Sequence, residues 1–174
     1  MPAPTLAVIG LGASLGDRAT TLELAARLLS VWPGIRVRRS SRLYWSAPVG
    51  GVAGAAFLNG AVLVATTLSP TALASALREI EVRLGRRPTR RWADRVIDLD
   101  LLWIEGVSVD EDGLTVPHPR LQQRDFALVP LLEVAPAARD PRTRGAYAQL
   151  PAALSRLSIV RSLPRPRSQA GRVP

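Results

Sequence analysis

The stretch Arg91–Trp103, RWADRVIDLDLLW, places two carboxylates inside an otherwise apolar run. If this run forms a β-strand, Asp98 and Asp100 point to the same face, because side chains two residues apart lie on one side of a sheet. The opposite face is then apolar and consists of Ile97, Leu99, Leu101 and Trp103. Like charges on a shared face repel, and burying them unpaired is costly. The pattern therefore predicts a cationic partner for the two aspartates.

A loop with five arginines, residues 85–95 (GRRPTRRWADR), comes directly before this strand. One interpretation is a sheet edge at which the carboxylates form ion pairs with these arginines, and the loop itself could be a solvated segment or a nucleic-acid patch. The other is a magnesium site, because Mg²⁺ is typically held by one or two carboxylates together with substrate phosphates. Two carboxylates could hold two ions on a triphosphate, with the loop and its Trp92 as a lid that closes over the phosphates.

Composition sets the class of protein. The chain has 174 residues, which predicts one domain, and a net charge of +9 in which all 23 basic residues are arginine. Such a charge favours polyanionic partners, namely nucleic acid, nucleotide or phosphate. Cysteine is absent, which excludes disulfides and thiolate metal sites and suits a cytoplasmic location. No basic segment precedes the first apolar stretch and no apolar run reaches about 20 residues, so neither a signal peptide nor a membrane span is expected.

Hydrophobic periodicity predicts strands over 5–12, 35–45, 57–67 and around Asp98, with helices over 14–32 and 70–84. The order βαββαβ is the split arrangement of ferredoxin-like folds, so we expect an α+β protein with an antiparallel sheet and helices packed on it. Residues 114–136 predict a short strand, a turn and a short helix, and residues 148–157 a further helix. We expect one domain over 1–160, whose C-terminal extension leads into a flexible Pro/Arg-rich tail over 161–174.

Two other motifs indicate different activities. GASLG (Gly12–Gly16) matches a nucleophile elbow, and the order Ser14, aspartate, His118 fits a hydrolase triad. However, Ser14 follows the first strand, so the upstream strands of that fold are missing. GLGASLG also loosely resembles a dinucleotide-binding turn, but repeated βαβ units do not follow it. We favour a glycine-rich turn between strand and helix. A lone histidine without cysteine cannot build a zinc site.

Four stretches together are similar to one family, 6-hydroxymethyl-7,8-dihydropterin pyrophosphokinase of folate biosynthesis. They are GLGASLGD, YWSAPVGGVAGAAFLNGAV, LGRRPTRRWADRVIDLDLLW and LTVPHPRLQQRDFALVPLLEVAP, which occur in the family's order and cover most of residues 7–136. The resemblance implies transfer of diphosphate from ATP to the hydroxymethyl group of a reduced pterin, with release of AMP and with two Mg²⁺ ions. It implies no nucleic-acid or membrane partner, and a monomer is compatible with it.

The resemblance also implies roles for particular residues. Asp98 and Asp100 match the metal ligands, and Arg86 and Arg95 match arginines that bind the phosphates during catalysis. The nucleotide side is completed by Glu81, Trp92, Thr115, His118 and Arg124. The pterin side comprises Ser46, Pro48, Val49, Phe57, Asn59 and Phe126, with the two phenylalanines sandwiching the ring and Asn59 bonding its edge.

The sequence departs from the family pattern at several positions. Ala13-Ser14 stands where Ser-Asn is usual, Ala93-Asp94 stands where Gly-Pro is usual, and Arg78 occupies a position expected to hold an uncharged polar residue. The alternative function is an arginine-rich nucleic-acid-binding module on the same topology. Sheets of that kind stack bases on aromatic residues, but the strand over 5–12 has none.

Overall fold

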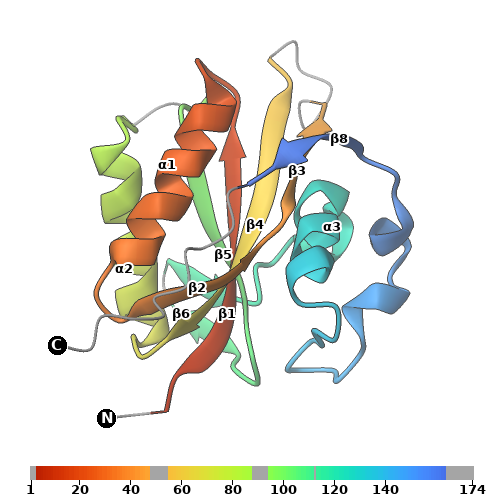
Figure 1. The fold of residues 1–174 in the computed structure, drawn as a ribbon. Helices are drawn as coiled ribbons and strands as arrows, with labels where there is room; N and C mark the ends of the chain where they lie inside the picture. Colours follow the sequence, from red (N-terminus) through yellow and green to blue (C-terminus); the bar gives the residue numbers. More distant parts are fainter. Residues whose placement is uncertain (1–2, 48–54, 88–93, 112, 164–174) are drawn as a thin grey trace, which may run out of the picture.

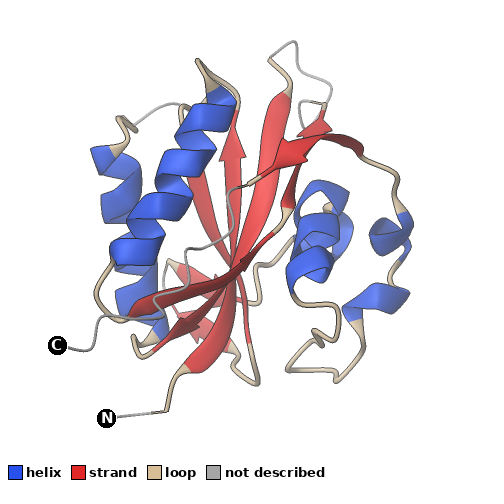
Figure 2. Ribbon diagram, viewed as in Figure 1, coloured by secondary structure: helices blue, strands red, loops and turns tan. Residues whose placement is uncertain are grey.

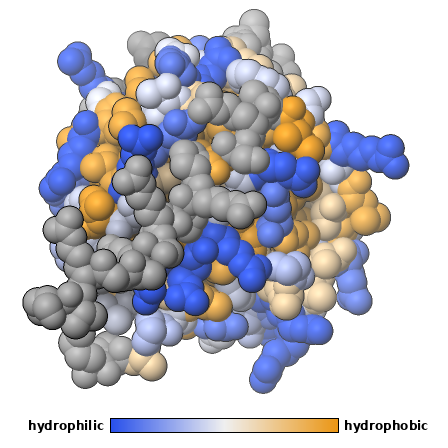
Figure 3. Space-filling model, viewed as in Figure 1, coloured by the Kyte–Doolittle hydropathy of each residue, from blue (hydrophilic) through white to orange (hydrophobic). Residues whose placement is uncertain are grey.

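The computed structural model describes residues 3–47, 55–87, 94–111 and 113–163. A central antiparallel sheet separates two helical layers (Figure 1, Figure 2), with helices α1 (Arg18–Val31) and α2 (Pro70–Arg83) on one face and α3 (Asp125–Val134) on the other. The α+β class expected from the sequence is thereby confirmed. Hydrophilic side chains surround smaller hydrophobic groups on the face seen in Figure 3, as the arginine-rich composition leads one to expect.

The main sheet has the strand order β5-β1-β4-β3-β8 within the described residues, and β2 pairs with β4 as well. Its strands are β1 (Thr5–Ala13), β2 (Ile35–Ser40), β3 (Arg42–Ser46), β4 (Phe57–Thr66), β5 (Asp98–Ile104) and β8 (Ser158–Ser162). A separate two-stranded sheet pairs β6 (Val109–Glu111) with β7 (Leu114–Val116). Short 3₁₀ turns cover Leu121–Gln123, Tyr147–Gln149 and Pro151–Leu154.

Helix α2 begins at Pro70 as expected, whereas α1 begins at Arg18 and not at residue 14. The side chain of Asp17 accepts the Thr20 N–H at the start of α1, and the side chain of Ser69 accepts the Ala72 N–H at the start of α2, where Pro70 takes the first helical position. After α2 the chain reverses through Gly85, whose φ of +90° favours glycine. The arginine-rich sequence follows Gly85 and precedes the first residue of β5.

The strand expected over 35–45 is divided into β2 and β3 at Ser41. The main-chain N–H of this buried serine still donates to the Ala61 carbonyl at 2.9 Å, while its hydroxyl accepts the Ala61 N–H at 2.8 Å and donates to the Arg42 carbonyl at 2.7 Å. The hydroxyl thus replaces a main-chain partner at the break. Both pieces still pair with β4.

The prediction that Trp103 lies on the same apolar face of β5 as Leu99 and Leu101 is wrong. Leu99 and Leu101 pack into the core beneath α1 and α2, but Trp103 packs into the second core beneath α3. The register with β1 pairs Leu101 with Ile9 and Trp103 with Val8, so Leu102 is an extra residue in β5. Such a bulge shifts the alternation of side chains by one, and it turns the Trp103 indole to donate to the Arg139 carbonyl at 2.8 Å.

The C-terminal region was only partly foreseen. The helix expected over 148–157 is instead a pair of 3₁₀ turns, since Pro151 interrupts the main-chain donors that a continuous helix needs. Strand β8 was not anticipated, and it adds to the edge of the sheet by pairing with β3. Among the residues that the structure describes, no helix is long and apolar enough to cross a bilayer.

One polar cluster joins α3 to the sheet. Glu133 accepts from the Tyr44 hydroxyl, the Arg42 main-chain N–H (3.1 Å) and the Arg42 Nε (3.0 Å). Tyr44 is only 3% exposed, and burial, followed by the Glu133 carboxylate, raises the pKa of its hydroxyl to about 12. The hydroxyl therefore stays protonated and serves as a permanent donor.

We expect Glu133→Ala to lower the free energy of unfolding by about 1–2 kcal/mol, because a buried hydroxyl and a main-chain donor lose a charged acceptor. The matched control is Glu79→Ala, which breaks an ion pair with Arg83 whose side chains are 54% and 56% exposed. That variant should lose only a few tenths of a kcal/mol. Urea denaturation measures both, and equal losses would show that the Glu133 cluster is no better than a surface pair.

Candidate active site

The two aspartates lie at one end of the sheet, where β5 begins. Asp98 pairs with Gly12 and Asp100 with Gly10 of β1, and Gly12 also pairs with Asn59 of β4. Because Leu99 and Leu101 point into the core beneath α1 and α2, the aspartates project to the face on which α3 lies. Three neighbouring strands therefore bring Asp98, Asp100 and Asn59 to the same end of the sheet.

Asp98 has the cationic partners that the sequence predicted. Arg95 Nη1 donates to both of its carboxylate oxygens, at 2.8 and 2.9 Å. Arg86 Nη1 donates to Asp98 Oδ1 at 2.9 Å and also to Glu81. Two guanidinium groups from the two ends of the arginine loop thus converge on one carboxylate.

The carboxylate of Glu81, near the end of α2, binds this cluster through Arg86. It is 4% exposed, and its carboxylate accepts the Leu99 main-chain N–H at 2.7 Å as well as the Arg86 guanidinium. Burial raises the pKa of this carboxyl above its ordinary range, while the Leu99 N–H and Arg86 act in the opposite direction. Glu81 therefore fastens the end of α2 to β5 and fixes the position of Arg86.

Asp100 differs from its neighbour because its side chain makes no hydrogen bond or ion pair with the described part of the chain. Burial, followed by the charge of Asp98, raises the pKa of Asp100 to about 6, and the positive charges of Arg124 and Arg95 only partly oppose this. Simple charge pairing at a sheet edge, the first interpretation of the sequence, therefore accounts for Asp98 but leaves Asp100 unexplained.

The pterin-side residues that are described gather where β3 ends and β4 begins. Ser46 lies opposite Phe57 in the register of these strands. The Asn59 side chain is 5% exposed, and its Nδ2 donates to Ser46 Oγ at 2.8 Å. Phe126 lies on the first turn of α3, with the Arg124 guanidinium 5.6 Å from its ring centroid. Pro48 and Val49 lie outside the described residues, as does Trp92.

The residues predicted to bind the nucleotide that follow β5 in the sequence, Thr115, His118 and Arg124, lie in or between β7 and the start of α3. The His118 main-chain N–H donates to the Leu102 carbonyl at 2.9 Å, and its Nδ1 accepts from the Arg120 N–H at 3.1 Å. Burial and then the charges of Arg124 and Arg120 lower the pKa of this imidazole, so it is neutral at neutral pH. Thr115 is turned toward β6 and donates to Asp110 at 3.2 Å. Arg78 donates to Ser75 on the exposed side of α2.

Comparison with known proteins decides the family. The family model for 7,8-dihydro-6-hydroxymethylpterin-pyrophosphokinase (HPPK) matches residues 8–136. The chain belongs to this family. A 2-amino-4-hydroxy-6-hydroxymethyldihydropteridine pyrophosphokinase of Methylorubrum extorquens is 44% identical over 132 residues, which is 76% of this chain and 84% of that protein. The Bacillus subtilis protein of the same name is 40% identical over 129 residues, which is 74% of this chain and 77% of that protein.

Solved structures agree at the level of the fold. The Plasmodium falciparum HPPK-DHPS wild-type structure superposes with a TM-score of 0.66 at 14% identity, over 83% of this chain. This chain spans 43% of that one. The protein is an ATP-dependent HPPK enzyme of folate biosynthesis, and no comparison supports the nucleic-acid-binding alternative.

Two departures from the HPPK pattern are in contact with each other. The Ser14 hydroxyl donates to Asp94 Oδ1 at 3.2 Å and accepts the Arg95 main-chain N–H at 2.9 Å, while the Ser14 N–H donates to the Arg95 carbonyl at 2.9 Å. Ser14 is fully buried, so it is not the exposed nucleophile that a hydrolase needs. Its role is to fix the backbone of Arg95 against the end of β1. The sequence marks Ser14 and Asp94 as departures from the family pattern, but it does not indicate that the two side chains are in contact.

We expect Asp100→Asn to raise the melting temperature of the metal-depleted protein by a few degrees at pH 7.5. A carboxyl whose pKa is raised in the folded state favours folding when protonated, and that contribution is lost as the pH rises toward 6. The difference should therefore vanish below about pH 4, where Asp100 is protonated in both states. Thermal melts across this range measure it. Asp98→Asn is the control and should destabilise, because two arginines lose their acceptor.

We expect Ser14→Ala to lower the free energy of unfolding by about 1–3 kcal/mol, because the Arg95 N–H loses its acceptor in a buried site. The KM for ATP should rise more than the KM for pterin, since Arg95 is displaced while β4 is not. Ser30→Ala, which removes a hydroxyl bonded to Arg27 on α1, is the matched control. Equal changes in both KM values would contradict a specific effect on Arg95.

Proposed function

We propose that the end of the sheet around Asp98 binds ATP and the reduced pterin side by side, so that the pterin hydroxyl attacks the β-phosphorus of ATP and AMP leaves. The observation that supports this most directly is the cluster in which Arg86 and Arg95 converge on Asp98 while the neighbouring Asp100 has no partner among the described residues. A site with this charge distribution suits a polyphosphate and its metal ions together.

We assign Asp98 and Asp100 as the ligands of two Mg²⁺ ions. Within the described residues no group of three or more His, Cys, Asp or Glu side chains is arranged to hold a metal. The fit is nevertheless good for Mg²⁺, which keeps several waters and needs only one or two carboxylates plus substrate phosphates. The unpaired Asp100 carboxylate supplies the oxygen donor. When bound, the metal neutralises charge that develops on the phosphate oxygens.

Arg86 and Arg95 act on the phosphates in this proposal. Guanidinium groups bind phosphate oxygens through a planar fork of donors, so a nucleotide polyphosphate competes with Asp98 for both of them. Glu81 keeps Arg86 in place during this exchange, and Ser14 keeps the backbone of Arg95 in place. Each guanidinium then moves only its terminal atoms, which lowers the cost of reorganisation.

The remaining nucleotide contacts come from residues around β7 and the start of α3. We assign Thr115, His118 and Arg124 to the nucleotide, together with Trp92, which lies outside the described residues. Because Nδ1 of the neutral His118 accepts the Arg120 N–H, the proton lies on Nε2, which can donate one hydrogen bond to the base or ribose. Arg124 adds positive charge near Asp100, which favours an anionic ligand.

We assign pterin binding to the region where β3 ends, β4 begins and α3 starts. Phe57 and Phe126 offer aromatic faces for stacking on the flat heterocycle, and Pro48 and Val49, which lie outside the described residues, are assigned to the same site. Asn59 Nδ2 is held by Ser46 Oγ, and no described residue donates to Asn59 Oδ1. That oxygen is therefore oriented to accept an N–H from the pterin edge, which selects one orientation of the ring.

No side chain is required as a general base. Phosphoryl-type transfer depends mainly on holding the two reactants in line and on stabilising charge. We further infer that the βαββαβ order and the strand sequence β5-β1-β4-β3 define a ferredoxin-like core. One domain over residues 1–160, acting as a monomer in the cytoplasm, completes the proposal.

The decisive experiment separates nucleotide products by chromatography after mixing protein, ATP, Mg²⁺ and 6-hydroxymethyl-7,8-dihydropterin. We expect AMP only when pterin and metal are both present. Asp98→Asn and Asp100→Asn should each lower kcat by roughly a thousandfold, because a metal ion contributes several kcal/mol to the transition state. Glu79→Gln, which removes a carboxylate from the exposed face of α2 in the same way, should leave the rate unchanged.

Two outcomes would contradict the proposal. Near-normal turnover in either aspartate variant would remove that residue from the metal site. Formation of ADP in place of AMP would mean attack at the terminal phosphorus, which the assigned geometry does not allow.

A further inference from the structure

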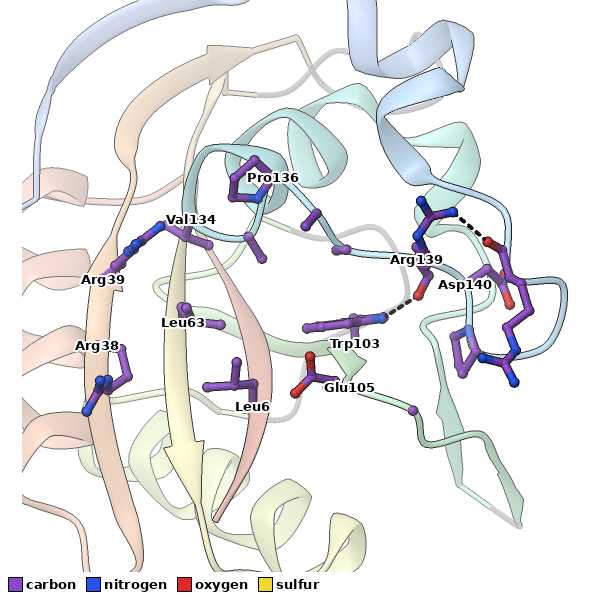
Figure 4. A pocket seen from close by; sticks show the side chains of 16 residues that line it. Leu6, Arg38, Arg39, Leu63, Trp103, Glu105, Val134, Pro136, Arg139 and Asp140 are labelled. Atoms are coloured by element: carbon purple, nitrogen blue, oxygen red, sulfur yellow. Dashed lines mark hydrogen bonds between the residues drawn. The ribbon is translucent and has the colours of Figure 1, made fainter. Parts of the chain in front are cut away.

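A second concavity lies toward the other end of the sheet, away from the aspartates. It has a volume of about 930 Å³ and opens on the α3 side of the sheet (Figure 4). Its floor comes from β1, β4 and β5 through Leu6, Leu63 and Trp103, and its far wall from the chain that follows α3. None of the residues assigned to ATP, metal or pterin lines it.

Two β-bulges shape this groove. In β2, Val37 pairs with Val64 and Arg39 with Leu63, so Arg38 is an extra residue opposite β4. The bulge at Leu102 in β5 does the same on the other side of the central strands. Bulges redirect side chains and are enriched near functional sites. Here they turn Arg38, Arg39 and Trp103 into the same groove.

The charges in the groove are not balanced internally. Among the described residues, the guanidinium groups of Arg38 and Arg39 have no hydrogen-bond or ion-pair partner, and neither does the carboxylate of Glu105. Other polar groups of the wall are engaged: Asp140 accepts from Gln122 Nε2 at 2.8 Å, and Arg139 Nη1 donates to the Arg144 carbonyl at 3.1 Å. The groove therefore presents the guanidinium groups of Arg38 and Arg39 at β2, that of Arg144 on the far wall, and the Glu105 carboxylate directly after β5.

The surface between these charges is apolar. Leu63 is 8% and Trp103 5% exposed, so both form a rigid floor. Val134 and Pro136 close the groove from the α3 side, and the Glu105 carboxylate lies between Leu6 and Trp103 (Figure 4). Concave apolar sites with a few oriented polar groups are typical of small-molecule binding sites, and this volume is within their range.

We propose that this groove binds a small amphipathic anion. Its apolar, flat or branched body packs on Leu63 and Trp103, and its carboxylate, sulfonate or phosphate is bound by Arg38 and Arg39. An N–H or O–H group at the other end of the ligand donates to Glu105. The site is separate from the one that binds ATP and pterin, and both can be occupied together.

The probe for this proposal is 8-anilinonaphthalene-1-sulfonate, which combines a flat apolar body, one sulfonate and one N–H. The full chain is titrated with this dye while a non-hydrolysable ATP analogue, Mg²⁺ and pterin saturate the active site. We expect saturable binding with energy transfer from tryptophan to the dye. Trp103→Phe should lower that transfer, although Trp32, Trp45 and Trp92 remain as donors, and should leave the affinity nearly unchanged because an aromatic ring still supports the dye.

Charge variants test the anion contact. Replacing both guanidinium groups (Arg38→Gln with Arg39→Gln) should weaken dye binding roughly tenfold or more, since charge-assisted hydrogen bonds are lost. Arg27→Gln on the exposed surface of α1 removes the same kind of charge from the opposite face and should leave the affinity unchanged. Pterin pyrophosphokinase activity and the melting temperature should be the same in all three proteins, which excludes partial unfolding as the source of dye fluorescence.

Three results would overturn the proposal. Unchanged dye affinity in the double variant would show that Arg38 and Arg39 do not bind the anion. Equal weakening by Arg27→Gln would show that only net charge matters. Loss of the signal when ATP analogue and pterin are added would place the dye in the active site. None of these results affects the diphosphate transfer assigned above, which is measured through AMP.

Discussion

The site depends on keeping two carboxylates and two guanidinium groups at fixed positions before any substrate is present. Glu81 contacts both sides of this arrangement, because its carboxylate binds the Leu99 N–H of β5 and the guanidinium of Arg86. Ser14, directly after β1, fixes the main chain of Arg95 in a similar way, because it bonds both the N–H and the carbonyl of Arg95. Oriented charges of this kind stabilise a transition state without reorganising when it forms.

This preorganisation has a cost in stability. A buried Asp100 beside Asp98 is unfavourable in the ligand-free protein, as the raised pKa of Asp100 reflects. An asparagine would suit the fold better, but it would lack the charge that a divalent cation requires. The proposed metal site would explain why an apolar strand carries a residue that its own packing disfavours. In that proposal, the empty protein gives up some stability for affinity toward a metal–polyphosphate complex.

The sequence predicted those features that depend on local patterns. The alternation around Asp98 and Asp100, the helix that begins at Pro70 and the arginine-rich sequence before β5 all depend on a few neighbouring residues. Features that depend on distant pairing were missed. The bulge at Leu102 follows from the register with β1, the break at Ser41 from a bond to Ala61, and the contact of Ser14 with Asp94 from a sequence separation of 80 residues. No periodicity in a single segment encodes such contacts.

The bulges in β2 and β5 are not predicted by a simple alternation of side chains. They divide the α3 side of the sheet into two surfaces, the proposed nucleotide and pterin end and the arginine-rimmed groove. Before the bulge, β5 presents Asp98 and Asp100 to the nucleotide end; after it, Trp103 becomes the floor of the arginine-rimmed groove. Helix α3 spans the space between, since Phe126 on its first turn lies at the assigned pterin pocket and Val134 at its last lines the groove. Glu133 fastens this helix to β3 through Tyr44 and Arg42. A ligand that shifts the end of α3 therefore acts on the strand that carries Ser46, so this packed helix links the two surfaces in addition to strands β1, β4 and β5, which run through both.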